Sequence, residues 1–374
     1  MTIARDPSRK AAPTFSSWRF RFIAAGTAML IAGPALASPE SALVAAARRE
    51  GRVVVYSVLS NKAAQPLIAD FKAAYPGIEV DYDGDKGSNE MDERYRRESA
   101  SGEATADVVW SSAMDMQMKL IGDGFAVRYH SPEASGLPRW ANYKNIGYGT
   151  TQEPVVIVYN RQQLAEAEIP RDHTALAALL NSQTERFHGK VTAFDVEKSG
   201  VGYMLAVQDL RAAPATSSAL VAAFGKAGLQ PSGGTGDMLT GIDKGSFSIG
   251  YNMMGAYALS RSRKDLPNLG VVFPSDYTLV LSRIAFVSKR ATHPNAARLW
   301  LNYLLSARGQ KVLGDAIELF PIREGVEARY TAAKLRGAIG PAVREVPLDM
   351  SLAEAMKPGV RNPILASWRV AAGH

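Results

Sequence analysis

The chain is 374 residues long, a length typical of two domains. Hydrophobic residues make up 47% of it and charged residues 21%, an ordinary globular composition that excludes a disordered chain, a collagen and a polytopic membrane protein. The absence of cysteine excludes disulfides, thiolate metal sites, iron–sulfur clusters and cysteine nucleophiles.

The first 37 residues have the pattern of a cleavable secretory signal. A basic stretch ending at Arg21 precedes the apolar run 22–31, and Ala35-Leu36-Ala37 gives a small-residue cleavage site before Ser38. The run is too short to span a bilayer, and no later stretch approaches 18 apolar residues. We expect cleavage near Ala37-Ser38 and a periplasmic product without stable membrane insertion. The alternative is an uncleaved N-terminal anchor.

The charge balance argues against a nucleic-acid partner. The leader holds five of the 43 basic residues and one of the 36 acidic ones, so its removal lowers the net charge from +7 to about +3. Nucleic-acid binding needs a basic stripe with interleaved aromatic residues. The basic clusters, such as residues 92–98, are short and mixed with acids, which is typical of a solvated helix face.

The first part of the mature chain alternates strands with helices. We expect a helix over 40–50, strands over 53–56, 78–82 and 107–110, and a helix after each strand. This order predicts a parallel sheet with helices on both faces, whose ligands bind at the carboxyl ends of the strands.

Hydroxyl and amide side chains follow two of these strands. Ser57, Ser60 and Asn61 come after the first strand and Ser112 after the third. Such groups beside a helix N-terminus suit a carboxylate or phosphate, so we treat all four as candidate ligands. Capping of the following helix is the alternative role, and the two roles are compatible.

The middle of the chain predicts a second α/β domain. Strands are expected over 153–160, 191–195, 247–251 and 270–273, with helices between them, and a long apolar strand over 279–287 follows. Ser199-Gly200-Val201 precedes a helix expected to start near Tyr203. Small residues there allow backbone N–H groups to approach an anion, whereas a tight turn that needs glycine is the alternative.

Four further residues are candidate ligands only because of where they lie in the sequence. Tyr251 and Asn252 end a strand, where they could hydrogen-bond a ligand or pack in the core. Thr151 and Tyr277 flank the two places where the chain is expected to pass between the domains, so they face a cleft or serve as hinge residues. The Gly-rich segment 232–236 is interpreted as a flexible interdomain loop.

Enzyme motifs are missing from the sequence. It has no Walker A loop, no metal spacing among its five histidines and no G-x-S-x-G elbow. We therefore predict no catalytic residue, no metal site and no cofactor. Glu153 and Asp195 are acids near strand ends without a partner for acid–base chemistry, so salt bridges are their expected role.

Three stretches together carry a family resemblance: residues 82–112, Ser199-Gly200-Val201-Gly202-Tyr203, and residues 292–310. With the signal peptide, they resemble the extracellular solute-binding proteins of ABC importers, in the family that includes the ferric-ion-binding proteins. The resemblance covers about residues 45–325.

The resemblance implies the two-lobed periplasmic-binding-protein fold of type II, an α/β fold in which each lobe is a mixed sheet flanked by helices. Two crossover segments, near 150 and 275, would join lobe one (38–150 and 275–374) to lobe two (151–274). A solute would bind in the cleft, and the closed form would dock on a membrane permease. The family default is a monomer.

The same resemblance bears on the solute. Ferric binders of the family hold iron with two adjacent tyrosines beside an anion, and the aligned positions here are about Asn252 and Met253. Amide and thioether groups are poor ligands for Fe(III). We therefore expect a small phosphorylated or carboxylated organic solute, bound without metal. The alternatives are a solute-sensing accessory of a membrane kinase, a ferric-iron binder, and an enzyme on the same scaffold.

Overall fold

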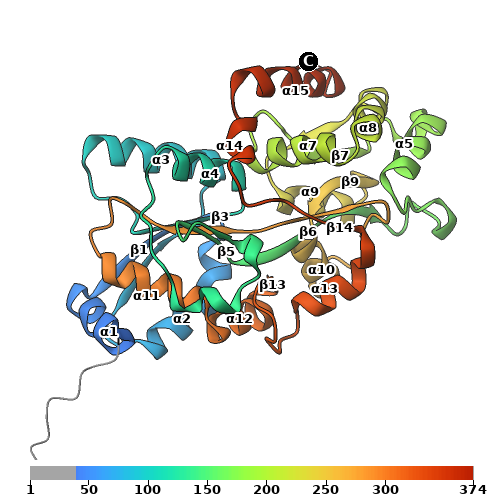
Figure 1. Cartoon of the computed structure of the whole chain (residues 1–374). Helices are drawn as coiled ribbons and strands as arrows, with labels where there is room; N and C mark the ends of the chain where they lie inside the picture. The colour runs from blue at the N-terminus through green and yellow to red at the C-terminus, as the bar shows by residue number, and fades with distance from the viewer. Residues whose placement is uncertain (1–38, 374) are drawn as a thin grey trace, which may run out of the picture. The chain divides into compact units, whose positions relative to one another are not determined.

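Two mixed β-sheets organise the described residues, 39–373, of the computed structural model. The predicted signal peptide and its cleavage site lie outside the described residues. Each sheet is flanked by helices (Figure 1).

The first sheet has the strand order β2-β1-β3-β12-β5-β4. Its strands are β1 (Arg52–Ser57), β2 (Glu79–Asp83), β3 (Val108–Ser111), β4 (Asn142–Tyr143), β5 (Gly147–Gly149) and β12 (Ile284–Val287). Strand β1 pairs in parallel with β2 and β3, as predicted, whereas β12 pairs antiparallel with β3 and β5. The sheet is mixed because β12 arrives from the C-terminal half of the chain.

The second sheet is centred on the long strand β6 (Thr151–Asn160), which pairs antiparallel with β9, β10, β11 and β13. The other strands are β7 (Val191–Phe194), β8 (Gln230–Ser232), β9 (Ile249–Met254), β10 (Leu269–Val272), β11 (Thr278–Leu281), β13 (Phe320–Pro321) and β14 (Val343–Glu345). Strand β7 lies parallel to both β8 and β9.

The helices are described in two groups, neither of which is continuous in the sequence. The first group is α1 (Pro39–Glu50), α2 (Asn61–Ala74), α3 (Ser88–Ser101), α4 (Met114–Gly122), α11 (Pro294–Leu305), α12 (Ala307–Val312) and α13 (Ala332–Ile339). The second is α5 (His173–Ser182), α6 (Thr184–Phe187), α7 (Gly200–Ala212), α8 (Pro214–Lys226), α9 (Thr235–Asp243), α10 (Gly255–Lys264), α14 (Ser351–Ala355) and α15 (Pro358–Ala371). Single turns occur at Pro132–Gly136, Arg139–Ala141, Glu166–Glu168, Leu313–Ile317 and Gly340–Ala342.

Within the described residues the chain passes between the sheets three times: at two adjacent places, and again between β12 and β13. It leaves β5 for β6 at Thr150, near the predicted position, and it leaves β11 for β12 at Ser282 and Arg283. The second crossing is therefore later than the predicted one near 275. The single strand expected over 279–287 is two strands, because β11 pairs with β6 and β12 pairs with β3.

The C-terminal tail associates with the second sheet. Strand β14 pairs with β11, and α15 packs against α8 and α7, as Figure 1 also shows. Trp368 of α15 packs on Phe224 of α8, with ring centroids 6.0 Å apart. Helix α14 also packs against α4, which flanks the first sheet. The placement of residues 275–374 in lobe one stays a prediction.

Aromatic packing fixes the helices of the first sheet. Phe71 of α2 meets Trp300 and Tyr303 of α11, with centroids 4.9 and 5.3 Å away in edge-on geometry. Leu67 and Phe71 are fully buried, and with Ile68 they belong to the inner face of α2. Burial of side chains of this size stabilises a fold by about 1.5–3 kcal/mol each.

Candidate functional site

A cavity of about 390 Å³ is lined by segments attached to both sheets. Its lining includes the starts of helices that flank the first sheet and of helices that flank the second. None of the described residues that line this cavity is an aspartate, a glutamate or a histidine. The cavity therefore offers hydrogen-bond donors and cations but no carboxylate.

The N-termini of four helices, α3, α4, α7 and α9, meet at this cavity. The lining residues at these helix starts are Gly87 and Ser88, Ser112, Ser199 and Val201, and Thr235 and Gly236. The first N–H groups of a helix lack partners within the helix, and the helix dipole gives that end a partial positive charge. Four such ends around one space form an environment that favours an anion.

Three of these four helix starts have no capping side chain. The N-cap residues of α3, α4 and α9 are Gly87, Ala113 and Gly234, and none makes a side-chain cap hydrogen bond. Only α7 is capped, by Ser199, whose Oγ accepts a hydrogen bond from the Gly202 N–H at 3.1 Å. At α4 the Ala113, Met114 and Met116 N–H groups already donate to Ser111, Ser112 and Asp115, so the uncapped starts of α3 and α9 are the ones that offer backbone N–H groups to a ligand.

The glycines of Ser199-Gly200-Val201-Gly202 serve close packing. A Cβ at Gly200 would lie 2.8 Å from the Met116 methyl of α4, and one at Gly202 would lie 2.6 Å from Cβ of Phe194. Neither glycine has a positive φ, so the turn itself does not require them. Helix α7 can approach α4 and β7 only because these side chains are missing.

Three cations line the cavity, each held by a carboxylate outside it. Lys86 pairs with Glu90 at 2.7 Å, and Arg261 pairs with Asp265 at 2.8 Å. The third cation, Arg283, is buried and pairs with Glu153. Each of the three cations is therefore paired with a carboxylate that is not among the lining residues.

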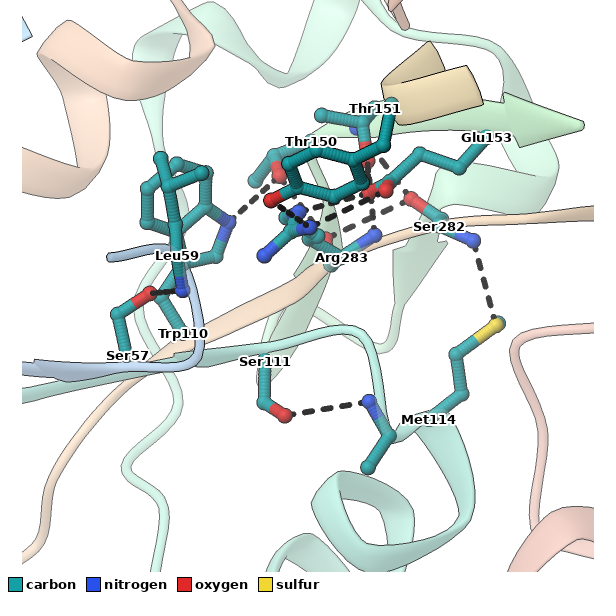
Figure 2. Close-up of polar contacts among 12 residues, drawn as sticks. Ser57, Leu59, Trp110, Ser111, Met114, Thr150, Thr151, Glu153, Ser282 and Arg283 are labelled. Atoms are coloured by element: carbon teal, nitrogen blue, oxygen red, sulfur yellow. Dashed lines mark hydrogen bonds and ion pairs between the residues drawn. The ribbon is translucent and has the colours of Figure 1, made fainter. Parts of the chain in front are cut away.

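Arg283 lies where the two crossing segments meet (Figure 2). Its Nε is 2.8 Å from Oε1 of Glu153, and its Nη2 donates to Oε2 at 3.2 Å. The Arg283 N–H donates to Oγ1 of Thr151 at 2.9 Å, and the Thr150 N–H donates to the Arg283 carbonyl at 2.9 Å. Burial disfavours the guanidinium, but the adjacent Glu153 carboxylate more than offsets this and raises the pKa of Arg283.

Comparison with known proteins identifies the family. A family model described as bacterial extracellular solute-binding protein matches residues 66–337, which is most of the chain. The chain belongs to this family of extracellular solute-binding proteins. A comparison with curated proteins found no match.

Solved structures of the same fold agree with that assignment. A substrate-binding protein of an ABC transporter from Agrobacterium tumefaciens is 31% identical, with a TM-score of 0.80 over 86% of this chain and 94% of that one. Apo ferric ion-binding protein A from Pasteurella haemolytica is 18% identical, with a TM-score of 0.68 over 86% and 98%. The periplasmic binding protein AfuA from Actinobacillus pleuropneumoniae, with exogenous fructose-6-phosphate bound, is 16% identical, with a TM-score of 0.67 over 87% and 99%.

The predicted fold and family are therefore confirmed. The chain is a solute-binding protein of the ABC-transporter type with the two-lobed periplasmic binding fold. No helix within residues 39–373 is long and apolar enough to cross a membrane. Within the same residues, no group of three or more metal-ligating side chains is suitably placed for a metal ion.

Only some of the predicted ligand residues line the cavity of this solute-binding protein. Ser112, Ser199 and Val201 do so, and Gly200 lies buried between Ser199 and Val201 at the start of α7. Their part in solute binding stays a prediction, because the structure holds no solute.

The residues after β1 form a separate, self-contained group. Oγ of buried Ser57 accepts a hydrogen bond from the Leu59 N–H at 3.1 Å, and Ser60 caps α2 by accepting from the Ala63 N–H. Asn61 donates from Nδ2 to Asp85 at 2.7 Å. Capping and loop closure engage these side chains, and none of the three predicted ligands borders the cavity.

Tyr251, Asn252 and Tyr277 surround a buried carboxylate instead of the cavity. Oδ2 of Asp209 accepts from the Tyr251 hydroxyl at 2.9 Å and from Nδ2 of Asn252 at 2.6 Å, and Oδ1 accepts from the Tyr277 hydroxyl at 3.1 Å. Burial, the largest cause, raises the pKa of Asp209. Thr151 is likewise buried, and it donates to Oε1 of Glu153 at 2.9 Å.

Sequence reasoning missed much of the cavity lining. Lys86, Tyr257, Arg261 and Arg283 were not predicted, and Thr235 belongs to the Gly-rich segment 232–236 that we interpreted as a flexible loop. That segment ends β8 and begins α9. An uncapped, glycine-rich helix start is the one local signal that could have identified it.

Proposed function

We propose that this protein binds a small organic anion, phosphorylated or carboxylated and without a metal ion, and delivers it to the permease of an ABC importer from the periplasm. The observation that carries the proposal is the meeting of four helix N-termini and three cations around a space with no carboxylate in its lining. Charge-assisted hydrogen bonds from such donors are about twice as strong as neutral ones.

The lining also limits the chemistry of the solute. An ammonium group prefers a carboxylate partner, and the described lining has none, so a solute without a cationic group fits best. Val201, Leu239 and Met254 offer an apolar wall for a short carbon skeleton. The volume of about 390 Å³ suits a small metabolite.

Binding would be coupled to closure of the two lobes. The cavity draws its donors from helices attached to both sheets, so a solute makes all its contacts only when the two groups of helices are close together. We propose that lobe one is built on the first sheet, that lobe two is built on the second sheet with α15, and that the closed monomer docks on the permease. No step in this cycle requires catalysis.

Thermal unfolding of the purified protein against a panel of solutes tests the proposal. The panel holds phosphate esters, phosphonates, di- and tricarboxylates, amino acids, sugars and Fe(III). A ligand at 100 times its Kd stabilises a protein by about 2.7 kcal/mol, which shifts the Tm by several degrees. We expect a shift confined to anions. A shift only with sugars, amino acids or Fe(III) would contradict the proposal.

A further inference from the structure

Arg283 differs from the other cations of the cavity in its burial. Its side chain is 2% exposed, whereas those of Lys86 and Arg261 are 34% exposed each. Buried ionic groups are retained in proteins only with partners for their hydrogen-bonding atoms. Each buried nitrogen of the Arg283 guanidinium is therefore expected to have a hydrogen-bond partner.

The partners of Arg283 are on one side of the guanidinium. Glu153 occupies the edge formed by Nε and Nη2, and the Tyr257 hydroxyl lies 3.4 Å from Nη2. Nη1 and Nε are both buried without a hydrogen-bond partner among the described residues, but Nε lies 2.8 Å from the Glu153 carboxylate whereas Nη1 has no ion-pair partner there. Arg283 is one of the residues that line the cavity, so Nη1 is a guanidinium donor that a solute there could satisfy.

The position of Glu153 is also fixed. This carboxylate is fully buried, and it accepts from Thr151 as well as from Arg283. Both arms of the ion pair belong to crossing segments, since Glu153 is near the start of β6 and Arg283 lies between β11 and β12 (Figure 2). The guanidinium therefore has little freedom to change its orientation.

From this arrangement we infer that Arg283 binds the anionic group of the solute through Nη1 and determines the preference for oxyanions, with Glu153 as the positioning residue. This inference rests on the proposed function and deepens it. A planar guanidinium fixed along one edge presents donors in a defined direction, which a lysine ammonium does not. Phosphoryl and carboxylate groups share the required chemistry, so both are candidates for the bound group.

The position of Arg283 at a crossing between the sheets gives its contact with the solute a second consequence. Arg283 is one of the residues at which the chain passes from the second sheet to the first, and its carbonyl also accepts from Oγ1 of Thr150 at 2.9 Å. A solute held by Nη1 is thereby connected directly to both crossing segments. Bound oxyanion would therefore stabilise the arrangement of the hinge as well as the lining of the cavity.

Trp110 provides a reporter for this site. The Arg283 guanidinium lies over the Trp110 ring, with Cζ 5.9 Å from the centroid, and the indole N–H donates to Oγ1 of Thr150 at 2.8 Å. An anion at Arg283 changes the charge next to this indole. We expect binding to change tryptophan emission, and a Trp110→Phe variant should bind without that change.

The test compares two variants of the pair in protein purified after expression of the full chain. Arg283→Lys keeps the positive charge beside Glu153, and the double variant Arg283→Gln with Glu153→Gln removes both charges. The probes are inorganic phosphate, fructose-6-phosphate and succinate, which separate a phosphoryl from a carboxylate source. We expect both variants to raise the Kd of the bound probe at least tenfold, the effect of losing a hydrogen bond to a charged group.

Arg94→Lys is the matched control. Arg94 is 29% exposed, more than Arg283, and it likewise pairs with a carboxylate, Glu98, but it does not border the cavity. Its substitution should leave the Kd unchanged. An unchanged Kd in folded Arg283→Lys protein would overturn the inference and leave the proposed function intact. If wild-type protein binds no anion in the larger panel, both the proposed function and this inference are wrong.

Discussion

Nδ2 of Asn89 donates a hydrogen bond to the Lys198 carbonyl at 2.8 Å, across 109 residues of sequence. Asn89 belongs to the first turn of α3, and Lys198 immediately precedes the N-cap of α7. The bond joins helices that flank different sheets, at the edge of the cavity where both helices begin. It is therefore a direct link between the two sides of the candidate site.

Asn89→Ala removes this link and should weaken solute binding. A lost neutral hydrogen bond costs about 0.5–1.5 kcal/mol, so we expect the Kd of the bound anion to rise about two- to tenfold. Isothermal titration calorimetry measures the effect. Asn181→Ala is the control, because that exposed side chain donates to Ala177 of its own helix and accepts from Lys226 of α8, and none of these residues lines the cavity; its Kd should match wild type. Equal Kd values for both variants would mean that the link does not contribute to binding.

Ser199→Ala should affect both stability and binding. Loss of an N-cap side chain destabilises a protein by about 1 kcal/mol. Thr331→Ala is a matched comparison, because Thr331 caps α13 by accepting from the Lys334 N–H at 3.1 Å, away from the cavity. Both variants should lower the unfolding free energy in urea by a similar amount. Only Ser199→Ala should raise the Kd, by about two- to tenfold; an effect on stability alone would restrict Ser199 to capping.

Tyr251→Phe should change stability but not solute affinity. The variant removes one of the three hydrogen bonds to Asp209, at a cost of about 1 kcal/mol. Burial raises the pKa of the Tyr251 hydroxyl well above its ordinary value, which disfavours the phenolate that Fe(III) requires. We expect no visible phenolate-to-iron band when Fe(III) is added to wild type. A band that disappears in Tyr251→Phe would revive ferric-iron binding.

Asp115 should make stability depend on pH. Burial raises the pKa of this carboxyl in the first turn of α4 from 3.8 to about 7. Between these pH values the folded protein holds a proton that the unfolded chain has lost, so stability decreases as pH rises through this window. The total effect is on the order of a few kcal/mol.

Asp115→Asn removes the titrating group and should flatten that decrease. Oδ1 of the amide can still accept from the Met116 N–H, as the carboxylate does at 2.9 Å. Urea unfolding at pH 5 and pH 8 measures the difference, with exposed Asp349→Asn as the control. A wild-type protein as stable at pH 8 as at pH 5, after the control is subtracted, would contradict the prediction.

Local sequence patterns were sufficient to predict the framework of the fold. Alternation of apolar strands with helices predicted β1, β2 and β3 in parallel. The family resemblance predicted the two-lobed fold and an anion site at Ser199. These features depend on residues close together in the sequence, or on motifs that a family shares.

The sequence by itself predicted most helices and strands to within a few residues of their starts, and hence which hydroxyls and glycines stand beside helix N-termini. The strand expected over 279–287 is nonetheless two strands, and the helix expected near Tyr203 begins at Gly200. Only the tertiary structure decided which of those starts meet. Ser57, Ser60 and Ser199 have the same local pattern, but only Ser199 borders the cavity, because convergence depends on packing between distant segments. Arg283 and Glu153 are 130 residues apart, so their pairing beside the cavity arises only where the two crossing segments lie side by side.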